Sequence, residues 1–184
     1  LDETEQEITI KGEGLLPRTI TLQTKNGYKL LVDISLAVDT AYKQEKQKQE
    51  AEKKAKEKAW SAFSNYIRTR DCIRFTGDPD NGVCVTCKRQ YPFKKLQAGH
   101  FIDGRGNSVL FDERIVYSQC YGCNVGNGGA YVEYFVFMEQ EWGREKIDEF
   151  RALKHDTKIY KVYDFQEIEE TFKLKTQELL KNNR

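Results

Sequence analysis

The sequence predicts an α+β fold in which short antiparallel strands and long helices surround a metal-bound segment. Three observations predict this fold. Two Cys-x-x-Cys pairs lie 32 residues apart in a chain that has only five cysteines. Apolar and polar residues alternate before residue 36, as in half-buried strands. Further along, Ala, Lys, Glu and Gln dominate, and apolar residues recur every three or four positions, as in amphipathic helices.

Composition narrows the classes of protein to consider. The chain has 184 residues, of which 39% are hydrophobic and 32% charged, so one or two polar globular domains are expected. No apolar run approaches the roughly 18 residues that a membrane span needs, and the start lacks a signal-peptide pattern. We therefore expect no membrane partner and a reducing, cytoplasmic setting, in which cysteines hold metal more often than they form disulfides.

Charge is unevenly distributed along the chain. The net charge is only +1, but the segment from Lys43 to Arg105 has 15 basic and 8 acidic residues, net +7, which leaves −6 for the rest. A basic face beside acidic flanks is typical of nucleic-acid binding, although a solvated charged helix produces a similar split.

Three parts are predicted along the chain. Residues 1–38 form an accessory element of two or three antiparallel strands at 8–10, 19–22 and 28–34, with Asn26-Gly27 as a hairpin turn. Residues 39–74 form a charged long helix and a connector. Residues 75–184 form a zinc-stabilised domain that ends in helices near 130–138, 145–153 and 164–180.

The cysteine pairs indicate a structural zinc site with four thiolate ligands, two from each pair. The ligands are Cys84, Cys87, Cys120 and Cys123. The fifth cysteine, Cys72, is expected to be a small buried apolar residue.

Between and after these pairs, the order of elements resembles the ββα-metal (HNH-like) nuclease site. Strands are predicted at 96–102 and 114–118, with a Gly-rich turn between them and a helix from about residue 130. His100 lies late on the first strand, and Asn124 directly follows the last cysteine. In such sites the zinc is structural, and a separate divalent ion takes part in the reaction.

Phosphodiester hydrolysis needs an activated water and a neutralised phosphate. An imidazole such as His100 can accept a proton near neutral pH. The Asn124 amide oxygen suits Mg²⁺ or Mn²⁺, as do Asn127, one helical turn further on, and Asp103 if the chain turns back. His100 and Asn124 are therefore the predicted catalytic residues, and Asn124, Asn127 and Asp103 the predicted ligands of the catalytic ion.

Two positions depart from the usual site. An acidic residue or histidine commonly precedes the catalytic histidine as an ion ligand, whereas this chain has Gly99. An asparagine usually braces the loop five residues before the second cysteine pair, whereas this chain has Ile115. Either Asn107 or another group replaces it, or the loop is looser.

Basic residues interleave with the aromatic Tyr91 and Phe93 around the predicted strand, a pattern that suits contact with a nucleic-acid backbone and bases. Taken one at a time, each is also consistent with an ordinary surface residue. The predicted DNA-binding residues are Lys88, Arg89, Lys94, Lys95, Arg105, Arg68 and Arg70.

Several motifs in register resemble the phage lambda NinG (Rap) family of recombination endonucleases over about residues 51–180. They are the stretches 63–71, Cys84-Val85-Thr86-Cys87, 97–101, 119–124 and 131–134. The resemblance implies a metal-dependent endonuclease, a hydrolase, that cuts branched DNA such as Holliday junctions and D-loops. It also implies a homodimer in the bacterial host cell, encoded by a phage or prophage, with phage or host recombination proteins as partners. The alternative is a non-catalytic, zinc-stabilised DNA-binding or scaffold module.

Overall fold

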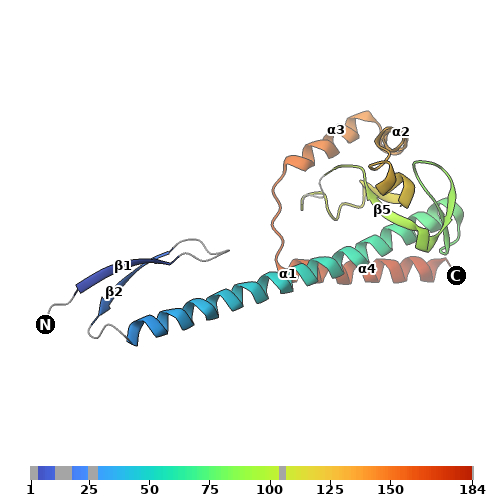
Figure 1. Ribbon diagram of the computed structural model, residues 1–184. Coiled ribbons are helices and arrows are strands. Elements are labelled where there is room, and N and C mark those ends of the chain that lie inside the picture. Colours follow the sequence, from blue (N-terminus) through green and yellow to red (C-terminus); the bar gives the residue numbers. More distant parts are fainter. Residues whose placement is uncertain (1–3, 11–17, 25–28, 104–106, 184) are drawn as a thin grey trace. The chain divides into compact units, whose positions relative to one another are not determined.

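The computed structural model describes residues 4–10, 18–24, 29–103 and 107–183, with side chains from residue 40 onward. The chain divides into two compact units, Leu1–Glu52 and Lys53–Arg184. Strands and helices both occur, with helices predominating, so the predicted α+β class is confirmed (Figure 1). None of the helices in the described residues combines the length and apolar character that crossing a membrane requires.

The first unit begins with two strands, β1 (Thr4–Ile10) and β2 (Arg18–Thr24). They pair antiparallel with Thr4 opposite Thr24 and Ile10 opposite Arg18, which confirms the predicted antiparallel pair. The third strand predicted at 28–34 is wrong, because helix α1 begins at Lys29. Adding residues to an existing helix is easier than starting a new element, and no Gly or Pro lies between Lys29 and Thr76 to stop it. The predicted Asn26-Gly27 turn lies outside the described residues.

Helix α1 (Lys29–Thr76) has two different halves. From Thr40 to Lys54 every side chain is exposed, as predicted for the charged stretch. Ala55, Ala59, Phe63 and Ile67 are buried at intervals of four residues. The helix continues through residues that the sequence assigned to a connector, because Asp71 and Cys72 are fully buried there.

Four short strands and several helices complete the described part of the second unit (Figure 1). Strands β3 (Asn81–Val83) and β4 (Gln90–Pro92) pair antiparallel, and the short 3-10 helix η1 (Phe93–Lys95) follows. Strands β5 (Leu96–His100) and β6 (Val116–Cys120) form a second antiparallel pair. The remaining elements are η2 (Gly122–Gly126), a π-helix, α2 (Tyr131–Trp142), α3 (Arg144–Ala152), η3 (Leu153–His155) and α4 (Val162–Asn182).

The core of this unit lies between the buried half of α1, the β5–β6 pair and the C-terminal helices. Phe63 of α1 packs edge-on against Phe172 of α4, with ring centroids 4.8 Å apart. On the other side of the strands, Tyr134 of α2 donates a hydrogen bond to the Gly99 carbonyl (2.7 Å) and accepts one from the Tyr117 backbone amide (2.9 Å). Both strands are therefore held between helices.

Candidate metal centre and the two faces of strand β5

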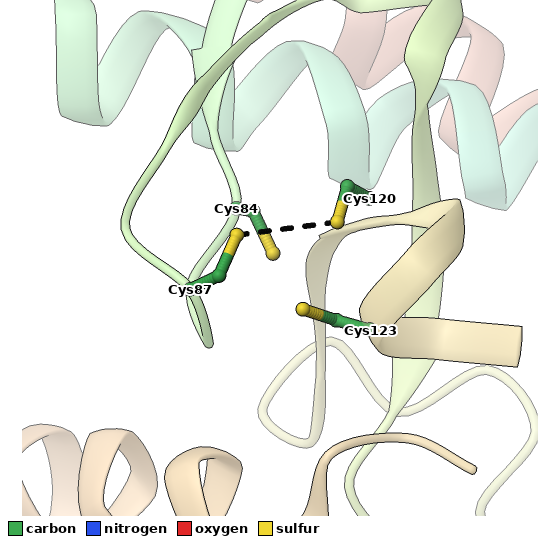
Figure 2. Close-up of side chains that lie close together, drawn as sticks. All are labelled: Cys84, Cys87, Cys120 and Cys123. Carbon is green, nitrogen blue, oxygen red and sulfur yellow. Dashed lines mark hydrogen bonds between the residues drawn. The ribbon is translucent and has the colours of Figure 1, made fainter. Parts of the chain in front are cut away.

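The four predicted zinc ligands lie together (Figure 2). Cys84 and Cys87 occupy the turn between β3 and β4, Cys120 ends β6, and Cys123 lies in η2. Their Sγ atoms are all within 4.8 Å of one another, and the Cys87 and Cys120 sulfurs are 4.0 Å apart. Four sulfurs placed tetrahedrally about 2.3 Å from one zinc ion would be about 3.8 Å apart. The cluster therefore fits a structural metal ion such as zinc.

The local backbone explains how the first pair turns toward the second. The Lys88 amide donates to the Cys84 carbonyl (2.9 Å), and the Cys84 amide donates to the Arg89 carbonyl (2.9 Å). Lys88 has φ of 61°, a left-handed conformation that a tight turn requires and that costs a non-glycine residue energy. The turn thus directs both thiols of its Cys-x-x-Cys pair inward.

The pKa values of Cys84 and Cys123 favour a bound cation in the cluster. Burial raises the pKa of Cys84, but hydrogen bonds from the Thr86 hydroxyl and from backbone amides outweigh this effect and lower the pKa to about 7. Burial is also the main cause that raises the pKa of Cys123 to about 12, and nearby cysteine side chains add to it. Four thiolates can coexist here only if a positive ion offsets their repulsion, as zinc does.

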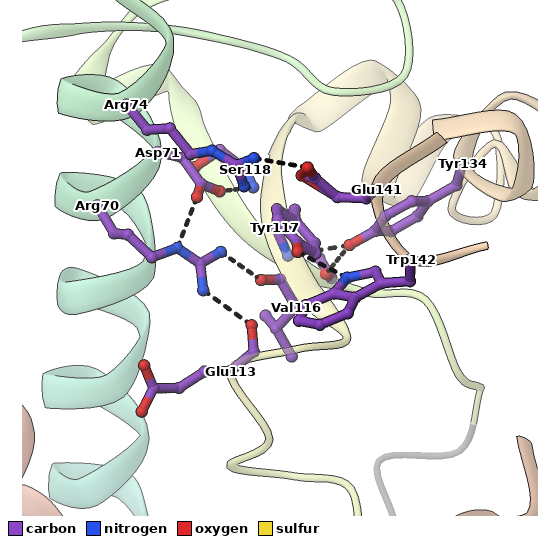
Figure 3. A network of polar contacts seen from close by, with 11 residues as sticks. Arg70, Asp71, Arg74, Glu113, Val116, Tyr117, Ser118, Tyr134, Glu141 and Trp142 are labelled. Carbon is purple, nitrogen blue, oxygen red and sulfur yellow. Dashed lines mark hydrogen bonds and ion pairs between the residues drawn. The ribbon is translucent and has the colours of Figure 1, made fainter. Parts of the chain in front are cut away.

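Asp71 and Arg70, neighbours on α1, hold β6 and the loop before it (Figure 3). The buried Asp71 carboxylate accepts hydrogen bonds from the Ser118 amide (2.7 Å) and from Arg70 Nε (2.8 Å). The Arg70 guanidinium also donates to the carbonyls of Glu113 (2.8 Å) and Val116 (2.9 Å). Arg70 thus braces the loop that Ile115 was expected to leave unsupported.

This network gives one of the predicted DNA-binding residues a structural role. Arg70 directs its described hydrogen bonds to Asp71 and to the two carbonyls, and its contact with DNA remains a prediction. Arg68 is half-buried, with its guanidinium 4.3 Å from the Phe93 ring centroid. Asn107 was the other candidate brace, and it accepts a hydrogen bond from Lys56 Nζ (2.9 Å) instead.

The remaining predicted DNA-binding residues are on the surface, apart from Arg105, which lies outside the described residues. The exposed residues are Lys88, Arg89, Lys94 and Lys95. The first two follow the first cysteine pair, and the other two lie in η1 directly before β5. These four basic residues are thus adjacent in the chain to the turn that holds Cys84 and Cys87 and to strand β5, which ends at His100.

One face of β5 carries His100. The imidazole stacks on Trp60 of α1, with ring centroids 5.2 Å apart and planes 18° apart. Its Nε2 atom is 3.1 Å from the Leu110 carbonyl, which can only accept a hydrogen bond. Nε2 therefore carries the proton, and Nδ1 is the basic nitrogen. Nδ1 is buried in this arrangement.

The opposite face of β5 carries Gln97 and Gly99, because side chains alternate along a strand. Asn124 of η2 lies on this face and donates from Nδ2 to Gln97 Oε1 (2.8 Å). Its Oδ1 atom is 3.1 Å from the point where a Cβ on Gly99 would lie. Gln119 of β6, opposite Gln97 in the strand register, approaches the same point. We call the group formed by Gln97, Gly99, Gln119 and Asn124 the amide cradle.

The structure does not bring the two predicted catalytic side chains together. His100 contacts α1 and Leu110, whereas Asn124 contacts the other face of the strand. In this conformation the two side chains do not face one site, and their catalytic roles remain predictions. Asn127 is exposed, and the expectation of an α-helical turn between it and Asn124 fails, because the Asn127 amide bonds to the Gly122 carbonyl in a π-helical pattern. Asp103 is exposed three residues after His100.

A pocket beyond the end of β5 brings Asp103 together with Arg151 and Lys154, which the sequence did not single out. It has a volume of about 400 Å³ and is lined by Phe101, Ile102, Asp103, Tyr131, Arg151, Lys154 and His155. The Phe101 and Tyr131 rings stack within it, with planes 9° apart. Arg151 donates a hydrogen bond to the Tyr131 hydroxyl. His155 is exposed. No sequence motif connects β5 to α3, so only the fold could reveal this grouping.

The fold and the cysteine cluster define a mostly helical α+β protein with four clustered cysteines that fit a structural metal ion. The family model described as "Bacteriophage Lambda NinG protein" matches residues 36–182, and the chain belongs to this family. That membership confirms the resemblance seen in the motifs and points to a phage, recombination-related function. No curated protein and no solved structure matches the chain.

Proposed function

We propose that this chain is a divalent-metal-dependent endonuclease that cuts branched DNA recombination intermediates. The observation that carries the proposal is the convergence of amide oxygens of the amide cradle beside Gly99, next in the chain to His100, in a member of the NinG family. Amide oxygens are hard donors of the kind that Mg²⁺ and Mn²⁺ bind, and these ions retain open positions for water and phosphate. Asn124 Oδ1 would hold the ion, which would stabilise the charge on the phosphate and the leaving oxygen.

His100 is the proposed general base. Its Nδ1 would take a proton from the attacking water while Nε2 remains bound to the Leu110 carbonyl. Nδ1 is buried in this structure, so the role requires that the contacts around it change when DNA binds. The proposed product of each step is a cut in one strand, with the bond from phosphorus to the 3′ oxygen broken.

The DNA backbone would follow two positively charged regions. One comprises the exposed residues Lys88, Arg89, Lys94 and Lys95. The other is the pocket beyond β5, where Lys154 and Arg151 accompany an exposed aromatic ring, Tyr131. Phosphate neutralisation together with base stacking suits unpaired or distorted DNA near a junction. We further propose that a homodimer cuts the junction in the host cytoplasm, alongside other recombination proteins.

A non-catalytic DNA-binding or scaffold role is the second candidate. The observation that favours it is the stack of His100 on Trp60, on the opposite face of β5 from Asn124. In that case His100 packs the strand against α1 and takes no part in a reaction.

A junction-cleavage assay separates the two candidates. The zinc-loaded protein would be incubated with a labelled four-way junction and Mg²⁺, Mn²⁺ or Ca²⁺, and compared with the variant His100→Phe. Phe keeps a ring against Trp60 but has no basic nitrogen. We expect nicking by the wild type with Mg²⁺ or Mn²⁺, and a loss of about 10²-fold or more in the variant, with junction binding retained. Binding without cleavage in every metal would favour the scaffold role, and equal cleavage by the variant would exclude His100 as the base.

A further inference from the structure

Gln119 is a fully buried polar residue on β6 with an unusual environment. Its Nε2 group donates to the Gly129 carbonyl (2.7 Å) and lies 3.5 Å from the Thr86 hydroxyl. Its Oε1 atom, however, has no hydrogen-bond donor within the part of the chain that the structure describes. Buried amide oxygens nearly always have a partner, so an orphaned one calls for a specific explanation.

The position of this oxygen indicates the explanation. Oε1 of Gln119 lies 2.0 Å from the point where a Cβ on Gly99 would be, and Oδ1 of Asn124 lies 3.1 Å from the same point. The two oxygens are therefore at most 5.1 Å apart. The amide of Asn124 is oriented by its bond to Gln97, which directs Oδ1 rather than Nδ2 toward Gly99. Gln119 Oε1 thus occupies the space that a side chain at Gly99 would take, and Asn124 Oδ1 lies beside it.

We infer that Gln119 Oε1 is a second protein ligand of the divalent cation, beside Asn124 Oδ1. The inference rests on the proposed function, because that function requires the cation. Ligand oxygens about 2.1 Å from an octahedral ion are about 3.0 Å apart when adjacent and about 4.2 Å apart when opposite. Binding of the ion therefore requires that the two amides rotate until their oxygens reach one of these separations. Gly99 then has a clear role, because any side chain at this position would displace Gln119 Oε1.

The donor set also predicts the strength of binding. Both amide ligands are neutral, so they attract a cation less than carboxylates do, and water and DNA phosphate would complete the coordination. We therefore expect weak binding of the ion by the protein alone. The cation would be held firmly only when a phosphate group is present.

The test measures Mn²⁺ binding directly, from the loss of the free-ion EPR signal, with zinc-loaded full-length chain and Mn²⁺ as the only added ligand. Two variants form a matched pair, Gln119→Glu and Gln119→Met. Both lose the amide donor to Gly129, but only Glu keeps a ligand oxygen. We expect Met to weaken Mn²⁺ binding by at least about tenfold and Glu to bind at least as tightly as the wild type. Gln90→Glu, at an exposed position on β4, controls for the added charge and should leave binding unchanged.

A double variant distinguishes the loss of a ligand from the loss of folding. In the double variant Gly99→Asp with Gln119→Ala, the carboxylate enters the space that Gln119 vacates, and Mn²⁺ binding should return. The absorption of Co²⁺ in the four-thiolate site, next in sequence to Gln119, reports whether each variant keeps its fold.

The outcomes separate this inference from the proposed function. If Asn124→Leu removes Mn²⁺ binding while Gln119→Met and Gln119→Glu both bind like the wild type, Gln119 only packs against Gly99 and the inference is overturned, although the endonuclease proposal stands. If Asn124→Leu also binds normally, the cation lies elsewhere and both fail. A loss in Gln119→Met with recovery in the double variant supports the inference.

Discussion

The cysteine cluster and the amide cradle are built from neighbouring residues but have opposite chemistry. Gln119 directly precedes Cys120, and Asn124 directly follows Cys123. The cluster offers four soft sulfurs, all within 4.8 Å of one another, which is enough to complete a zinc ion's coordination. The cradle offers neutral amide oxygens, which in the proposed function would leave several positions of a hard cation open.

In the proposed function, this difference separates a structural site from a reactive one. A closed tetrahedral site has no position for a substrate, so its ion can only hold the fold together. A site with few protein ligands binds its ion weakly, but the open positions admit water and phosphate. Because Gln119 and Asn124 are each next in sequence to a cysteine, the cluster sets where these two amides lie. The following predictions test this division of roles.

Removal of the structural ion should have the largest effect. Structural zinc contributes about 10–16 kcal/mol of apparent binding free energy in small zinc domains, and that energy is coupled to folding. We expect one zinc per chain, and we expect a chelator or Cys120→Ser to abolish cooperative thermal unfolding of the second unit. Zinc analysis and circular dichroism measure these effects. An unchanged melting curve after complete removal of zinc would show that the cluster is dispensable.

Loss of the Asp71 carboxylate should have the second-largest effect on folding stability. Asp71→Ala leaves the largely buried Arg70 guanidinium without its ion-pair partner and the Ser118 amide without an acceptor. Breaking a buried ion pair in this way costs about 3–5 kcal/mol. Arg114→Ala is the control. It breaks an ion pair with Asp112 in which the arginine side chain is 46% exposed, and it should lower the free energy of unfolding by less than about 1 kcal/mol. Chemical denaturation measures both, and similar costs for the two variants would contradict the bracing role.

A methyl group in the cradle should have an intermediate effect. In Gly99→Ala the new Cβ would lie 2.0 Å from Gln119 Oε1, so the amide must move. Overpacking of this kind costs about 1–3 kcal/mol. Gly126→Ala is the matched control, because no atom lies within 4 Å of its Cβ position, and it should not be destabilised. If the two alanine variants unfold at the same temperature, the cradle is less tightly packed than described.

Charge removal at η1 should have the smallest effect on the fold. Lys94 and Lys95 are exposed, so replacing both with Ala should change the unfolding free energy by less than about 0.5 kcal/mol. Junction binding should nevertheless weaken, and the slope of log K against log salt should fall by about 1 for each DNA phosphate that a lysine no longer neutralises. Fluorescence anisotropy over a salt series measures this. An unchanged slope would show that Lys94 and Lys95 do not contact the DNA.

Local patterns predicted much of the fold. The Cys-x-x-Cys spacing predicted the cluster because each pair spans one tight turn, whose geometry depends on only a few residues. Helical periodicity located α2, α3, α4 and the buried half of α1. It failed at 28–34, where alternation is compatible with both strand and helix and the adjacent helix decided the outcome.

The sequence could not determine which residues contact each other across strands and between elements far apart in the chain. By itself, the sequence determined the cysteine cluster, most of the helices and the family. Only the tertiary structure decided that Arg70 braces β6, that His100 and Asn124 lie on opposite faces of β5, and that Gln119 Oε1 faces Gly99. The physical reason is that strand register and packing fix which faces meet, and both depend on contacts between residues far apart in the chain.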